Sequence, residues 1–156
     1  MAEKGKKPPK PGGTSQVPSA AELRKLGAER EATKATEASR QLEAEEERKK
    51  ALLAELSARK VTPDRVQNAV RILRELATAG QNEVLVLRFP NDLCSDRGRA
   101  INNSEPNWPQ TLKGFPREIY ETWAKEFRDK GYRMTAKIVD FPGGKPGDVG
   151  IYMSWD

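Results

Sequence analysis

Residues 19–60 constrain the fold of this chain more than any other part of the sequence. Alanine, glutamate, lysine, arginine and leucine fill the segment, and all five are strong helix formers. Ser19 followed by Glu22 matches a capping box, which marks the start of a helix. We therefore expect one continuous helix, about 60 Å long at 1.5 Å per residue. Three pairs with the acidic residue four positions before the basic one support it: Glu45 with Lys49, Glu46 with Lys50, and Glu55 with Arg59.

The apolar stripe of this helix is thin. A seam with alternating spacings of four and three runs from Ala21 to Leu56, but most of its apolar members are alanine, and Glu46 and Lys49 interrupt it. A stable coiled coil needs Leu, Ile or Val at most such positions. Two interpretations remain open: a solvated helix that folds alone or against a partner, and a weak coiled coil.

Residues 1–18 lack apolar periodicity and are rich in proline, glycine and lysine, so we predict a disordered basic arm. Residues 1–60 carry a net charge of +4 and residues 61–156 only +1. A nucleic-acid-binding domain usually has a basic patch on its folded surface, which this distribution does not favour. The arm could still contact phosphates weakly, or it serves solubility. Its basic residues are Lys4, Lys6, Lys7 and Lys10.

Residues 61–156 hold the pattern of a small folded domain. Thr62 as N-cap, Pro63 in the first turn and Gly80 after the last turn bound a helix with an apolar stripe. Another helix is expected at 115–130, with Ile119, Tyr120, Trp123 and Phe127 on its buried face. The strands are expected at 83–89, 132–141 and 149–155, with a turn at 142–148 between the last two.

This order predicts an α+β fold, in which a small α-β-α-β-β domain follows the long helix. A helix between the first two strands favours a parallel crossover, and the hairpin adds an antiparallel strand, giving a three-stranded mixed sheet with helices on one face. Residues 83–89 are apolar almost without alternation, so both faces of that strand should be covered. The opposite face of the sheet has no evident cover, which points to a partner.

Residues 90–114 form a long connection without a regular pattern, and connections of this length are usually functional or disordered. Leu93, Ile101 and Leu112 can anchor it to the domain. Trp108 either joins a contact patch, as Trp and Arg often do, or pins the loop down. We predict a partner-binding surface here, formed by Arg97, Arg99, Asn102, Asn103, Glu105 and Trp108.

An anion site is a second interpretation of the basic residues near the strand ends, because arginine forms bidentate hydrogen bonds with carboxylates and phosphates. The alternative is internal pairing with Asp92, Asp96 or Glu105. The candidate anion-binding residues are Arg88, Arg97, Arg99, Lys113 and Lys145.

Composition argues against several kinds of chemistry. The chain has no histidine, which excludes Ser-His-Asp triads and histidine metal ligands, and Cys94 is its only cysteine. Cys94 and Arg99 stand one residue too close for a thiol-phosphatase loop. Asp92, Asp96 and Glu105 do not have the spacing of a calcium-binding EF-hand. We expect no catalytic residues, metal or cofactor.

The longest apolar run covers only 84–87, too short for a membrane span, and no secretory segment opens the chain. We therefore expect a cytoplasmic protein. The favoured function is a non-enzymatic protein–protein interaction or assembly module that uses the long helix and the 90–114 surface, with a protein partner or a second copy. The alternatives are a nucleic-acid-associated protein that uses the lysine arm with Arg97 and Arg99, and a small-anion-binding domain or enzyme.

Overall fold

A computed structural model describes residues 16–156, and the larger part of the predicted basic arm, residues 1–15, lies outside this range. The chain divides into two compact units, one ending at Glu47 and the other spanning Arg48–Asp156. The second unit thus includes residues upstream of Val61, where the sequence pattern places the start of the folded domain.

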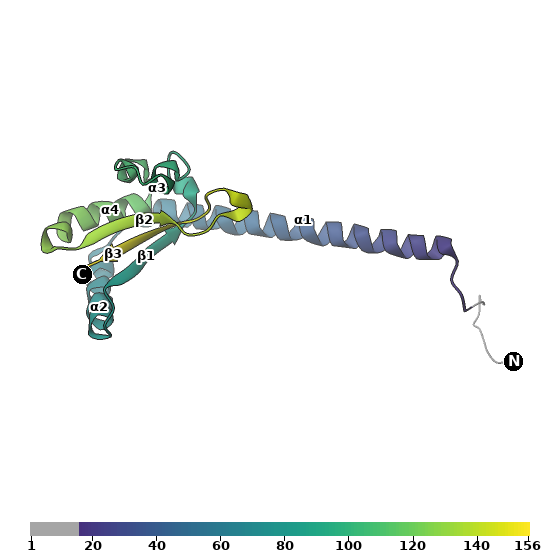
Figure 1. The fold of residues 1–156 in the computed structure, drawn as a ribbon, viewed down its shortest axis with the longest axis horizontal. Helices are drawn as coiled ribbons and strands as arrows, with labels where there is room; N and C mark the ends of the chain where they lie inside the picture. Colours follow the sequence, from purple (N-terminus) through teal and green to yellow (C-terminus); the bar gives the residue numbers. More distant parts are fainter. Residues whose placement is uncertain (1–15) are drawn as a thin grey trace. The chain divides into compact units, whose positions relative to one another are not determined.

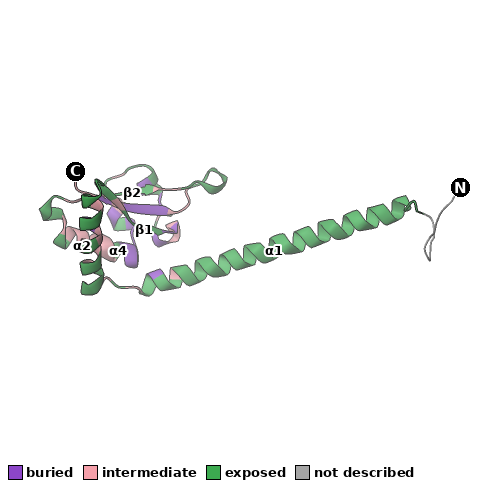
Figure 2. Cartoon of the chain, turned by 90° about the horizontal axis from the view of Figure 1, so that it is seen from below, coloured by how far each residue is buried: buried purple, intermediate pink, exposed green. Residues whose placement is uncertain are grey.

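Helix α1 (Ala20–Ala58) confirms the expected long helix. Its capping signal is used as predicted, because the backbone N–H of Glu22 donates to the Ser19 hydroxyl at 3.1 Å. Every residue from Ala20 to Leu52 is exposed, as the colouring of α1 in Figure 2 shows. Burial begins only in the last turns, where Leu56 is 1% exposed.

The second unit contains the predicted helices and strands (Figure 1). The Thr62 hydroxyl caps α2 by accepting from the Arg65 N–H at 3.2 Å. The second predicted helix ends earlier than expected, at Glu126, and a 3₁₀ turn at 128–130 follows it. The main elements are α2 (Pro63–Thr78), β1 (Glu83–Phe89), α3 (Arg99–Asn102), α4 (Phe115–Glu126), β2 (Arg133–Ile138) and β3 (Val149–Ser154).

The sheet is antiparallel throughout, with strand order β1-β3-β2, so the predicted mixed sheet is wrong in its pairing. Strands β1 and β2 do run in the same direction, as a crossover requires, but they are not neighbours. Strand β3 returns through the hairpin and pairs with both. It carries Val149, Ile151 and Met153, all buried, so the central position covers its apolar side chains from two sides.

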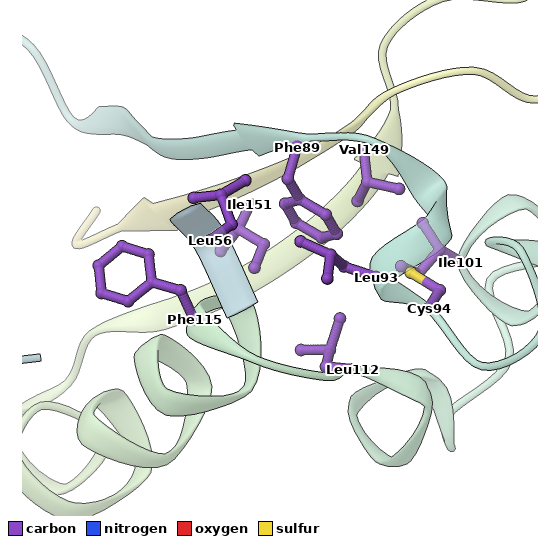
Figure 3. Close-up of a cluster of buried hydrophobic side chains, with 9 residues drawn as sticks. All are labelled: Leu56, Phe89, Leu93, Cys94, Ile101, Leu112, Phe115, Val149 and Ile151. Carbon is purple, nitrogen blue, oxygen red and sulfur yellow. The ribbon is translucent and has the colours of Figure 1, made fainter. Parts of the chain in front are cut away.

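One hydrophobic core forms on the inner face of the sheet (Figure 3). The end of α1, the strands, the 90–114 segment and the start of α4 all contribute to it. Burial of apolar side chains is the main stabilising term in a domain of this size. The buried members are Leu56, Phe89, Leu93, Cys94, Ile101, Leu112, Phe115, Val149 and Ile151.

The outer face of the sheet differs from the expectation that both faces of β1 are covered. Leu85 is 47% exposed, and a β-bulge between Leu85 and Leu87 interrupts the pairing of this edge strand. In the centre, the Tyr152 ring lies over Gly150, where a Cβ would come within 2.9 Å of it. The Lys137 ammonium lies 4.4 Å from the centre of the same ring. Side chains of the sheet itself therefore shield only the middle of this face, and an antiparallel sheet can leave one face to solvent.

Candidate functional site

The 90–114 segment is folded rather than irregular. Its two ends pair through an antiparallel bridge between Cys94 and Leu112, with the Ser95 N–H donating to the Thr111 carbonyl at 2.7 Å. The Lys113 N–H donates to the Leu93 carbonyl at 2.8 Å. With α3 and one 3₁₀ turn, Trp108–Thr111, between these ends, the segment is a compact loop whose ends are close together.

Asp96 organises the turn before α3. Its carboxylate accepts from the backbone N–H groups of Gly98 at 3.0 Å and Ala100 at 2.9 Å. Arg97, between Asp96 and Gly98, has a φ of 59°. The carboxylate oxygens of Asp96 therefore accept hydrogen bonds from the backbone of this turn, which is a common role of aspartate in turns.

Three of the predicted partner-binding residues, Arg99, Asn103 and Glu105, lie together. Arg99 pairs with Glu105 at 3.0 Å, and the Asn103 amide lies 3.5 Å from the same carboxylate. Arg97 stands apart from this group, at 3.7 Å from Asp92, and its side chain is 75% exposed. Arg97, Arg99, Asn102 and Asn103 are all exposed, so a partner could reach this side of the loop.

Trp108 anchors the loop. Its ring meets that of Tyr120 edge to face, with ring centres 5.7 Å apart, and the residue is partly buried. Its carbonyl accepts from the Thr111 hydroxyl at 2.7 Å. The geometry favours the pinning interpretation of Trp108 over the contact patch.

The arginines of the predicted anion site each have a carboxylate partner. Arg88 reaches Asp148 at 2.9 Å and Asp140 at 3.3 Å, and the hydrogen bond to Asp148 raises the pKa of Arg88. Arg97 and Arg99 pair with Asp92 and Glu105, as described above. This is the internal pairing that the sequence left open. Lys113 and Lys145 are exposed, and binding of an anion by this set remains a prediction.

Asp92 joins the loop to the end of α1. Lys49 lies 2.9 Å from its carboxylate, instead of pairing along the helix with Glu45. Partial burial alone would raise the pKa of Asp92, but the hydrogen bond and charge of Lys49, aided by Arg97, outweigh it and hold the pKa below its ordinary value. The ion pair is therefore charged at neutral pH.

Cys94 has the environment of an inert core thiol. It is 1% exposed, and burial raises its pKa to about 11, an effect that the neighbouring Thr111 hydroxyl offsets only in part. A thiolate is the reactive form, so this thiol is a poor nucleophile. No cluster of three potential metal-ligating side chains occurs within residues 16–156. The carboxylates weighed as metal ligands serve instead as backbone acceptors and ion-pair partners.

A second surface, which the sequence analysis did not single out, lies between α2 and α4. Glu118 of α4 accepts from the Val61 N–H at 3.1 Å and pairs with Lys60 at 2.8 Å, which holds the connection before α2. The Lys60 hydrogen bond lowers the pKa of Glu118. Beside this joint lies an apolar cavity of about 280 Å³. The apolar stripes of α2 and α4 were visible in the sequence, but the gap that leaves a cavity between the two helices was not.

No helix in the described part of the chain is both long and apolar enough to cross a bilayer. No protein family model, curated protein or solved structure matches this chain.

Proposed function

We propose that this protein is a non-enzymatic assembly module, in which α1 associates with another helix and residues 48–156 form the attached domain. The observation that carries the proposal is the exposure of leucines along α1. Leu23, Leu26 and Leu42 are 55%, 61% and 61% exposed. In most proteins the stability of a helix comes from packing of its apolar face, which residues 20–52 do not obtain within the described chain.

The surface chemistry of α1 favours a helical partner. Ala28, Ala32 and Ala35 lie on the same seam as Leu42, and small side chains let two helix backbones approach closely. Alanine buries little apolar area, so the association is expected to be weak unless the partner supplies larger side chains. Suitable partners are a second copy of this chain or an amphipathic helix of another protein.

The 90–114 loop offers a second contact surface in this proposal. Its exposed polar residues lie on a rigid frame, because Leu93, Ile101 and Leu112 are buried beneath them. Arg99 and Asn103 share one carboxylate, Glu105, which a partner's carboxylate could replace.

Sedimentation equilibrium of the full chain over a wide concentration range tests the proposal. We expect a mass above that of the monomer at high concentration, which Leu42→Lys on the seam removes. Thr33→Lys, on the same exposed helix but off the seam, is the matched control. If the chain stays monomeric, the same pair of variants is compared in affinity capture from the source cell. A captured protein that Leu42→Lys releases and Thr33→Lys retains supports the heterotypic form.

Two outcomes contradict the proposal. One is a monomer at every concentration with no captured protein that depends on Leu42. The other is tight, salt-sensitive binding to nucleic acid, which would favour the alternative role of the lysine arm.

A further inference from the structure

The cavity between α2 and α4 is closed on its third side by the inner face of the sheet. It measures about 280 Å³, close to the lower end of the range for small-molecule sites. All its lining residues belong to the 48–156 unit. Its apolar wall includes Val66, Ala69, Ile72, Trp123, Met134 and Met153.

The cavity is partly open to solvent, and several of its apolar side chains, such as Val66 and Ile72, are only half-buried. One wall is fixed by Trp123, whose indole N–H donates to the Tyr132 carbonyl at 3.2 Å. The guanidinium of Arg128, in the 3₁₀ turn after α4, lies 4.7 Å from the centre of the Trp123 ring system. On the other wall, Leu73 of α2 is buried, while Val66 and Ala69 remain half-buried. Contacts elsewhere thus hold the two walls apart.

Two arginines stand at one end of the cavity. The guanidinium carbons of Arg59 and Arg65 lie 5.1 Å and 5.6 Å from the centre of the Phe115 ring. They are the charged residues among those that line the cavity. The site therefore combines an apolar interior with positive charge at one end.

The hydrogen-bonding capacity of these arginines is only partly used. The terminal nitrogen of Arg59 pairs with Glu55, but its Nε is buried and has no hydrogen-bond partner. Among residues 16–156, no carboxylate lies within ion-pair distance of the Arg65 guanidinium. The exposed Arg65 guanidinium is the group that can meet a ligand here, because an anionic oxygen at this end of the cavity would form a charge-assisted hydrogen bond with it.

We propose that this cavity binds a small amphipathic carboxylate, with the apolar chain against Trp123, Met134 and Met153 and the carboxylate at Arg59 and Arg65. This role goes beyond assembly through α1. A cationic ligand would meet repulsion from both guanidinium groups. A neutral one would offer Arg65 a weaker acceptor than a carboxylate.

Methionine methyl NMR of the full chain gives a direct test. The chain contains three methionines, and two of them, Met134 and Met153, line the cavity, so Met1 serves as an internal reference. Decanoate is the probe, below its micelle concentration, and decanol and decylammonium are its matched analogues. We expect decanoate to shift the Met134 and Met153 methyl signals with saturation and to leave that of Met1 unchanged.

Two variants locate the two ends of the ligand. Arg65→Gln should weaken decanoate binding about tenfold, as loss of one charge-assisted contact does. Arg71→Gln is the control, because Arg71 is on the same helix but pairs with Glu75 at 2.9 Å. Ala69→Leu should fill the cavity and abolish the shifts without lowering the melting temperature.

The proposal is overturned if the Met134 and Met153 signals do not move. It is equally overturned if decylammonium binds as well as decanoate, or if Ala69→Leu, shown to be folded by its methyl spectrum, binds decanoate unchanged. None of these results bears on the sedimentation test of α1, so the two proposals fail separately.

Discussion

Leu42 and Leu56 lie on the same helix and on the same seam, yet Leu42 is 61% exposed and Leu56 is 1% exposed. Their local sequences are alike, since both are surrounded by alanine, glutamate and charged neighbours. What differs is what each side chain meets. Leu56 lies in the core with Phe89 and Phe115, whereas residues 20–52 are exposed at every position.

This contrast separates two sources of helical stability in one element. Between Ala20 and Leu52 the helix depends on the intrinsic preference of its residues and on pairs such as Glu31 with Lys34, which are 3.6 Å apart. Such pairs contribute only tenths of a kcal/mol each. The end of the helix is held by packing, which contributes several times more. A long helix can thus be part of the core at one end only.

The largest expected effect follows directly from this contrast. Leu56→Ala should lower the free energy of unfolding by about 2–5 kcal/mol, the usual cost of removing a fully buried leucine. Leu42→Ala should change it by less than about 0.5 kcal/mol, because an exposed site loses little. Urea denaturation at low protein concentration, followed by tryptophan fluorescence, measures both.

Equal effects of Leu56→Ala and Leu42→Ala on the free energy of unfolding would contradict the contrast between a buried and an exposed leucine. A large effect of Leu42→Ala that grows with protein concentration would instead show that Leu42 is buried in an assembly.

Short-range signals in the sequence were enough to predict the main helices and strands. The Ser19 and Thr62 caps define helix starts through contacts over three residues, and both hydrogen bonds form. The alternation of Val149, Ile151 and Met153, all buried, is likewise typical of a strand with one face in the core. These features depend on local chemistry alone.

Long-range pairing could not be obtained in this way. The rule for crossovers fixed the relative direction of β1 and β2 but not whether another strand lies between them, so the sheet order was missed. Nothing near Leu56 indicates that it meets the glycine at position 114, which comes much later in the chain. The register shift between Leu85 and Leu87 was likewise not indicated by any sequence pattern.

The candidate site shows the same limit. The sequence located the loop, its apolar anchors and the alternative of internal pairing for its arginines. It could not show which carboxylate each arginine meets, and Lys49 pairs with Asp92 instead of Glu45. The cavity at Arg59 and Arg65 was missed because it depends on the gap between two helices.

The rate at which Cys94 is alkylated reports on the core that Cys94 shares with Leu56. With a pKa of about 11, this thiol should hold about a hundredfold less thiolate at pH 8 than an ordinary cysteine, before burial slows access further. The native chain should therefore react with iodoacetamide at least about a hundredfold more slowly than the urea-unfolded chain.

The Leu56→Ala variant should raise the native labelling rate of Cys94, because a destabilised core opens more often. Leu42→Ala is the control and should leave the rate unchanged. Rapid labelling of the native chain with no effect of either substitution would contradict the burial of Cys94.

Gly114 lets the end of α1 pack closely against the core, and its substitution is expected to have the next largest effect on stability. Its φ is +66°, and a Cβ would lie 3.1 Å from the Leu56 carbonyl oxygen and 3.2 Å from the Ser57 Cα. Gly114→Ala should cost about 1–3 kcal/mol from overpacking in addition to backbone strain.

Gly131→Ala separates these two causes. Its φ is also positive, +96°, but no heavy atom lies within 4 Å of the Cβ site, so only the backbone cost of about 1 kcal/mol applies. Equal melting temperatures for the two variants would show that the contact between position 114 and α1 is unimportant.

The smallest effect concerns the ion pair between Lys49 and Asp92, where the helix first meets the loop. The pKa of Asp92 is lowered in the folded chain, so its contribution to stability is present above the ordinary aspartate pKa of about 3.9 and is lost as the pH falls through the lowered value. Asp92→Asn should therefore cost about 0.5 kcal/mol at pH 7, within the range for a partly exposed pair, and progressively less below about pH 4.

Lys49→Met should reproduce the loss at pH 7, whereas Lys50→Met, on the next residue of the same exposed helix, should have no comparable effect. High salt should reduce the cost of Asp92→Asn, since it screens partly exposed charges. Urea denaturation at several pH values measures the differences between these variants. A cost of Asp92→Asn that stays constant from pH 7 to pH 3 would mean that Asp92 acts through packing and not through its charge, and the end of α1 would then be held by apolar contacts such as those of Leu53 and Leu56.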